Sequence, residues 1–135
     1  MSAIDRVVQT WRYLAAERGD ERHAERTAQI LLARGADVEL VTAGFLHDRA
    51  KPADTRLWHR IAAVLVDAFA PALRPRLERG HGTFATYLGH ARHSADLARL
   101  EGRSDRIVRL ISRHHEPPTG EDERLLALAD REAMP

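Results

Sequence analysis

Helical periodicity is the feature of this sequence that most constrains its fold. Apolar residues recur at helical spacing along nearly the whole chain, beginning with the stripe Ile4, Val7, Val8, Trp11 and Leu14. No segment shows the strict alternation of a β-strand. Helices are expected over about 3–18, 21–34, 38–49, 55–69, 83–100, 105–115 and 121–132, with a short further one from Pro71 that Pro75 kinks or ends. The pattern predicts an all-α fold, a single-domain bundle of about seven or eight helices spanning 1–135.

Polar, glycine and proline residues mark the expected helix ends. Asp20, Asp37 and Ser104 each precede a helical stretch, where a side-chain oxygen can accept a hydrogen bond from the first turn. Gly35 is expected to end the second helix, because glycine favours the left-handed conformation found there. Pro52 is expected to end the third, because proline lacks the amide hydrogen that a helix uses.

Composition excludes several classes of function. The 135 residues carry 21 basic and 20 acidic side chains, with both signs interspersed, so no nucleic-acid surface is expected. Cysteine is absent, which excludes disulfides and thiolate metal sites. No stretch reaches the roughly 18 apolar residues of a membrane span, and the first residues contain no apolar block typical of a signal peptide. We expect a cytoplasmic protein without a membrane partner.

Side chains able to bind metal ions lie on or at the ends of five expected helices. They are His23, His47, Asp48, His90, His93, His114, His115 and Asp130. Imidazole and carboxylate groups can hold a divalent ion without thiolates, and a helical bundle can present them from facing helices. A carboxylate has two oxygens, so one aspartate can bridge two ions, whereas each histidine serves one.

Taken singly, these side chains also fit structural roles. His47 and Asp48 extend an apolar row, where an ionised carboxylate is costly unless it is paired or binds a metal, but a helix end that emerges into solvent fits equally well. The adjacent His114 and His115 would complement the negative end of a helix dipole. Asp130 can form an ordinary ion pair with an arginine. The residues alone leave both interpretations open.

Four segments, in order, resemble the HD superfamily of metal-dependent phosphohydrolases, most closely its HDIG-type members. Here "FLHDRAKP" is similar to their "LLHDIGKP", "HARHSADLA" to "HPxxGAxLA", "ISRHHEP" to "IxxHHEP" and "LLALAD" to "LLxxAD", over about 20–132. The chain departs from the family where Arg49-Ala50 replaces Ile-Gly and Ala91 replaces proline. Nothing resembles the GYP extension of cyclic-di-GMP phosphodiesterases or the acidic motif of (p)ppGpp hydrolases.

The resemblance implies a site for two divalent metal ions, with Mn, Fe, Mg, Co and Ni as candidates. The implied ligands of the first ion are His23, His47, Asp48 and Asp130. Asp48 would bridge to a second ion that is also held by His90 and His114. His115 matches a histidine that some relatives use for a further metal or for the substrate. His93, one helical turn after His90, is a candidate for contact with the ligands or the substrate.

The implied reaction is hydrolysis of a phosphoester in a small phosphorylated substrate, foremost a nucleotide. Two ions bridged by Asp48 would lower the pKa of a shared water and so supply a hydroxide. Lys51 is the only lysine of the chain and matches the lysine of the family's HDxxK motif, expected beside the substrate phosphate. Arg49 and Arg131 are further candidates for phosphate contact, because guanidinium groups match phosphate geometry.

Other functions fit the same residues. Some dinuclear HD proteins are mixed-valence di-iron oxygenases that cleave C–C or C–P bonds, and histidine with carboxylate suits iron well. A non-catalytic HD domain that binds a nucleotide is another alternative, although the intact ligand set argues against it. The third alternative is a helical scaffold protein that binds no metal ion.

Overall fold

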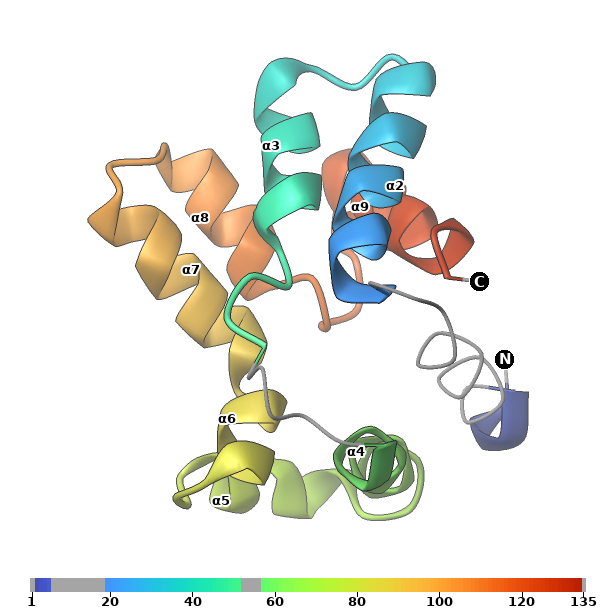
Figure 1. Ribbon diagram of the computed structural model, residues 1–135, viewed down its shortest axis with the longest axis vertical. Helices are drawn as coiled ribbons and strands as arrows, with labels where there is room; N and C mark the ends of the chain where they lie inside the picture. Colours follow the sequence, from blue (N-terminus) through green and yellow to red (C-terminus); the bar gives the residue numbers. More distant parts are fainter. Residues whose placement is uncertain (1, 6–18, 52–56, 135) are drawn as a thin grey trace. The chain divides into compact units, whose positions relative to one another are not determined.

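The computed structural model describes residues 2–5, 19–51 and 57–134. Its elements are α2 (Gly19–Ala33), α3 (Val38–Leu46), α4 (Leu57–Phe69), the short 3-10 helix η1 (Pro71–Leu73), α5 (Arg74–Glu78), α6 (Thr83–Leu88), α7 (His90–Leu100), α8 (Asp105–Ser112) and α9 (Glu121–Glu132) (Figure 1). The described ranges contain no strand, which confirms the predicted all-α fold. Within them, no helix combines the length and apolarity that a membrane crossing requires. Most of the predicted helix over 3–18, and Pro52, lie outside the described residues.

Several helix ends form as predicted. The Asp37 carboxylate accepts a hydrogen bond from the Leu40 amide at 3.0 Å and so caps α3, and Ser104 caps α8 in the same way. Gly35 has φ +79° and ends α2, a conformation that glycine adopts without steric cost. Asp20 was expected as a cap, but α2 already begins at Gly19, so Asp20 lies inside the helix.

Two predicted helices end earlier than their periodicity suggests. The prediction over 38–49 is too long, because α3 stops at Leu46 and residues 47–50 form a turn. The prediction over 105–115 is too long as well, because α8 stops at Ser112. The polar pairs at 47–48 and 114–115 therefore lie in turns just after helices.

Glycine and proline also change the predicted elements between 71 and 100. The single helix predicted over 83–100 is two helices, because Gly89 takes φ −90° and ψ 12° at the end of α6, and α7 begins at His90. Pro75 lies in the first turn of α5, where its missing amide hydrogen costs nothing. It begins a helix rather than ending one.

The described residues fall into two compact units. One, called here the five-helix unit, comprises residues 20–50 and 90–134 and contains α2, α3, α7, α8 and α9. The other includes residues 51 and 57–89 with α4, η1, α5 and α6, and its buried apolar side chains include Val64 and Leu88. The predicted single domain over 1–135 stays a prediction.

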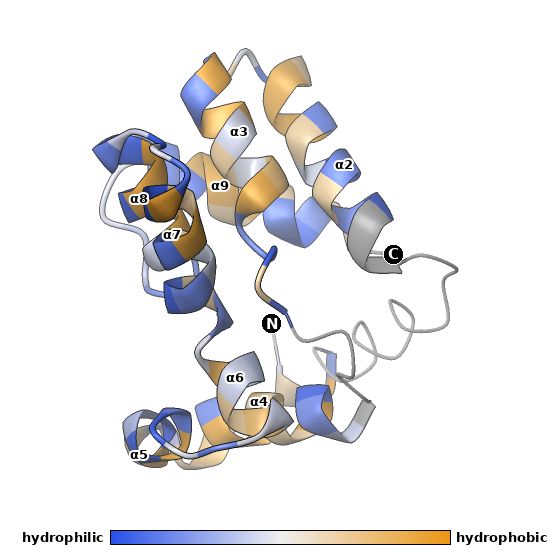
Figure 2. Ribbon diagram, turned by 60° about the vertical axis from the view of Figure 1, so that its left-hand side comes forward, coloured by the Kyte–Doolittle hydropathy of each residue, from blue (hydrophilic) through white to orange (hydrophobic). Residues whose placement is uncertain are grey.

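Apolar side chains from all five helices form the core of the five-helix unit. The buried cluster consists of Leu31, Leu40, Ala43, Ala95, Ala98, Ile107, Val108, Leu110, Ile111, Leu126 and Ala129. Helix α3 packs against α8 and α9, and α7 packs against α8. Figure 2 shows that hydrophobic and hydrophilic residues alternate along these helices, as burial of one face requires. Gly44 lets α2 and α3 approach closely, because a Cβ at this position would collide with the Leu31 side chain.

Candidate metal centre

Seven histidine and aspartate side chains converge within the five-helix unit. They are His23 on α2, His47 and Asp48 just after α3, His90 at the start of α7, His114 and His115 just after α8, and Asp130 on α9. They form two groups that share Asp48, and within each group the ligand atoms lie within 4.8 Å of one another. The structure thus brings together all six predicted ligands and His115.

The first group consists of His23, His47, Asp48 and Asp130. Nε2 of His23 lies 2.6 Å from Oδ1 of Asp130, and Nε2 of His47 lies 2.9 Å from the same oxygen. Oδ2 of Asp48 lies 3.4 Å from Nε2 of His47 and 3.7 Å from Nε2 of His23. Both imidazole rings are buried, so these polar atoms face one another away from bulk water.

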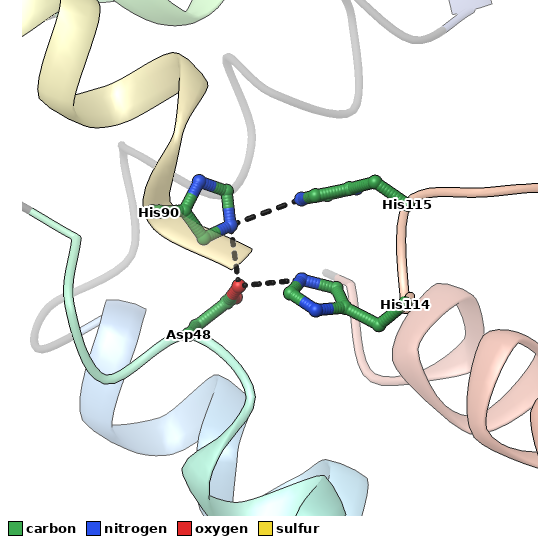
Figure 3. Close-up of side chains that lie close together, drawn as sticks. All are labelled: Asp48, His90, His114 and His115. Carbon is green, nitrogen blue, oxygen red and sulfur yellow. Dashed lines mark hydrogen bonds and ion pairs between the residues drawn. The ribbon is translucent and has the colours of Figure 1, made fainter. Parts of the chain in front are cut away.

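The second group consists of Asp48, His90, His114 and His115. Figure 3 shows the rings of His90 and His114 directed at the Asp48 carboxylate, with His115 directed at His90. Oδ1 of Asp48 lies 2.9 Å from Nε2 of His90 and 3.4 Å from Nε2 of His114. Nε2 of His115 lies 2.9 Å from Nε2 of His90, and His115 is the exposed member of the group.

The two oxygens of Asp48 face different groups. Oδ2 is the oxygen near His23 and His47, and Oδ1 is the oxygen near His90 and His114. A carboxylate in this position can contact one cation through each oxygen. The arrangement therefore suits a bridging ligand.

Backbone carbonyls orient two of the histidine rings. Nδ1 of His47 lies 2.6 Å from the Gly44 carbonyl oxygen, and Nδ1 of His114 lies 2.6 Å from that of Ile111. A carbonyl oxygen can only accept, so each Nδ1 carries the hydrogen and donates it. In a neutral ring the lone pair is then on Nε2, the atom that faces the Asp48 carboxylate.

The pKa values show that the first group attracts positive charge. Burial acts to lower the pKa of His47, but the carboxylates of Asp48 and Asp130 outweigh it and raise that pKa to about 9. Burial likewise acts to raise the pKa of Asp130, but His47 and His23 hold it well below its usual range. Two carboxylates thus keep a proton on His47, a place where a metal cation can supply the positive charge instead.

His114 gives the second group a neutral imidazole that can bind a metal ion. Burial lowers the pKa of His114 against the opposing effect of Asp48, so its ring stays neutral and its Nε2 lone pair is available. Within the described residues this buried Nε2 has no hydrogen-bond partner, a costly state that a metal ion would relieve. Imidazole nitrogens with carboxylate oxygens suit Mn, Fe, Co, Ni and Zn, so the residues present fit a divalent metal.

Other predicted site residues lie outside the two groups. His93 is exposed on α7, and Arg131 is exposed next to Asp130 on α9. The Arg49 guanidinium forms an ion pair with Glu101. Lys51 belongs to the other unit, and its predicted role beside a phosphate stays a prediction.

One residue near the centre was not singled out from the sequence. Ser94 on α7 is buried, and its Oγ accepts a hydrogen bond of 2.9 Å from the amide of Ala50, two residues after Asp48. Its position one helical turn after His90 is a signal in the sequence, but a serine at helical spacing has no specific meaning without its partner.

Comparison with known proteins agrees with this geometry. No curated protein and no solved structure matches the chain. The HD domain family matches residues 20–134, a range that includes every residue of the two groups. HD domains bind divalent metal ions, and within each of the two groups the ligand atoms lie close enough together to hold one ion. The chain belongs to the HD domain family.

Proposed function

We propose that this protein hydrolyses a phosphoester in a small phosphorylated substrate, foremost a nucleotide, with the help of two divalent metal ions. The observation that carries the proposal is the position of Asp48, whose two carboxylate oxygens face two separate groups of metal-binding side chains. Membership of the HD family, which suggests a metal-dependent hydrolase, supports it further.

In this proposal each group holds one ion. His23, His47 and Asp130 would complete the first site, and His90 and His114 the second, with Asp48 in both. His115 lies close enough to join the second site or to meet the substrate beside it. When bound, the ions supply Lewis-acid stabilisation of phosphoryl oxygens and lower the pKa of water.

The residues of the chain then have distinct tasks. Gly44 and Ile111 fix the rings of His47 and His114 through their carbonyl oxygens, so that each Nε2 is presented without a rotation of the ring. Lys51 is our first candidate for the cation that contacts the substrate phosphate. Arg49 is a weaker candidate, because a phosphate would have to compete with the Glu101 carboxylate for its guanidinium.

The test starts from the full-length protein. Metal content is measured by mass spectrometry, the metal is removed by chelation, and phosphomonoesters, phosphodiesters and nucleotides are screened with Mn²⁺, Mg²⁺, Fe²⁺, Co²⁺ and Ni²⁺. We expect turnover of at least one phosphate ester that depends on added metal and is absent in Asp48→Asn. Thermal unfolding in chelator controls for the fold of this variant.

The opposite result is equally clear. If the metal-loaded protein turns over no phosphate ester, the hydrolase proposal is wrong. Oxygen consumption together with a di-iron EPR signal would instead favour the oxygenase chemistry.

A further inference from the structure

In the part of the chain that the structure describes, few backbone hydrogen bonds hold the turn that carries Asp48. Helix α3 ends at Leu46, and residues 47–50 form a turn in which the Arg49 amide donates to the Leu46 carbonyl at 3.2 Å. A bridging carboxylate has to present each oxygen to a different group of ligands, so a small shift of this turn would misplace Asp48. Contacts from outside the turn must therefore hold it.

Helix α7 provides those contacts. The Ala50 amide donates to Oγ of Ser94 at 2.9 Å, and Ser94 is only 1% exposed. Further along α7, beyond its last turn, Glu101 forms an ion pair with Arg49. Arg49 and Ala50, which replace the Ile-Gly of the HDIG motif, thus both make these contacts: Ala50 with Ser94 on α7, and Arg49 with Glu101 just after α7.

Ser94 and His90 occupy the same face of α7, because they are four residues apart. His90 lies 2.9 Å from Oδ1 of Asp48, and Ser94 binds the backbone two residues after Asp48. One rigid helix therefore holds a ligand of the second group and also the turn that bears the shared carboxylate. This geometry ties the position of Asp48 to that of His90.

We propose that Ser94 is a positioning residue of the metal centre. Its buried hydroxyl holds Ala50 and so sets the distance between the Asp48 carboxylate and the His90 ring. Residues that orient metal ligands in this way contribute about 10–100-fold to metal affinity. The Arg49–Glu101 pair, with side chains 37% exposed, contributes less because solvent screens it. The inference rests on the two-ion centre of the proposed function.

The second group should depend on Ser94 more than the first. His47 keeps its own hydrogen bond to the Gly44 carbonyl, and Nε2 of His23 lies 2.6 Å from Oδ1 of Asp130. None of these contacts involves α7, so three ligands of the first group are held independently of it. His90 is the ligand that α7 supplies. Loss of the Ser94 hydroxyl therefore weakens the second ion most.

The test is Ser94→Ala in the full chain, titrated with Mn²⁺ after chelation and followed by calorimetry and by EPR of free Mn²⁺. The weaker of two Mn²⁺ sites should lose affinity by about tenfold, while the stronger site changes little. Ser94→Thr, which keeps the hydroxyl, should recover most of the loss. Thermal unfolding in chelator should remain cooperative with a modestly lower Tm, because the change removes one hydrogen bond while the helix keeps its Ala95 and Ala98 packing.

Ser112→Ala is the matched control, because among the described residues its hydroxyl donates only to the Arg109 carbonyl of its own helix. Glu101→Gln tests the exposed Arg49–Glu101 ion pair and should leave the Mn²⁺ affinities of both sites nearly unchanged. Equal Mn²⁺ affinities in Ser94→Ala and Ser112→Ala would overturn the role of Ser94 and leave the two-ion centre standing. A wild-type protein that binds no Mn²⁺ would overturn the centre, and this inference with it.

Discussion

At Asp48 a single carboxylate has two different surroundings, with Oδ2 near His47 and Oδ1 near His90. Asparagine has the same size but lacks the charge and one of the oxygens. We therefore expect Asp48→Asn to lose both Mn²⁺ ions, whereas His90→Ala loses one. Metal per chain, measured by mass spectrometry after gel filtration, distinguishes these outcomes. If Asp48→Asn retains one ion at wild-type affinity, the carboxylate is not shared.

The buried His47 ring predicts how the stability of the metal-free protein depends on pH. Its pKa in the folded chain is raised from 6.5 to about 9, since Asp48 and Asp130 outweigh the effect of burial. Because the pKa of His47 is higher in the folded chain than in the unfolded chain, protonation of His47 stabilises the fold fully at a pH below the unfolded-state pKa. This stabilisation is lost as the pH rises through the folded-state pKa. Thermal unfolding in chelator should therefore give a lower Tm at pH 9 than at pH 6.5.

His47→Gln provides the control for this pH dependence, because glutamine does not titrate. The variant should show a shallower fall in Tm over the same range, although it starts from a lower stability at pH 6.5. A wild-type Tm that is unchanged across the range would contradict the raised pKa.

At the scale of the elements, the caps at Asp37 and Ser104 and the helix end at Gly35 could be predicted, but the ends of α3, α6 and α8 could not. Apolar periodicity runs through Gly89 and up to His114, because a glycine or a polar pair does not interrupt a helical pattern in the sequence. The helices nevertheless break at Gly89 and after Ser112. The first of these breaks makes His90 the first residue of α7 instead of an interior one.

Contacts between distant elements were also beyond sequence reasoning. Arg49 was a candidate phosphate ligand because of its charge, but its pairing with Glu101 depends on where α7 ends. Among the described residues Ser94 is one of two serines within helices, and nothing in the sequence sets it apart from Ser112 before the Ala50 amide is seen to donate to its hydroxyl. The resemblance to the HD superfamily predicted which side chains meet in the two groups, whereas these positioning contacts depend on the packing of helices.

The close approach of α2 and α3 makes Gly44 intolerant of a side chain. Alanine at this helical position gains up to about 1 kcal/mol of helix propensity, but overpacking typically costs about 1–3 kcal/mol. At Gly44 the cost of overpacking exceeds the gain in helix propensity, because the Leu31 side chain is 0% exposed and cannot move into solvent. We expect Gly44→Ala to lower the free energy of unfolding in urea by about 1–2 kcal/mol.

Gly120→Ala is the matched control, because a Cβ there meets no atom within 4 Å and its φ of −148° is open to any residue. That variant should lower the free energy of unfolding by less than about 1 kcal/mol, because alanine is a poorer helix N-cap than glycine but meets no neighbouring atom here. Equal losses in the two variants would contradict the packing argument at Gly44.

At the scale of the whole molecule, the proposed ions tie five helices together. An ion that binds only the folded chain raises stability, by about 2.7 kcal/mol when its free concentration is 100 times Kd. Saturating Mn²⁺ should therefore raise the Tm by several degrees relative to the chelated protein. Asp48→Asn should show a much smaller shift, and an equal shift would place the bound ions elsewhere.

The contact between His23 and Asp130 joins residues that are 107 positions apart in the sequence. During synthesis His23, His47 and Asp48 leave the ribosome well before Asp130, so the first group stays incomplete until α9 has emerged. A nascent chain that lacks α9 has no fourth ligand with which to retain a tightly held ion. Retention of that ion would then mark chains that have been translated through Asp130 and have closed the loop between His23 and Asp130.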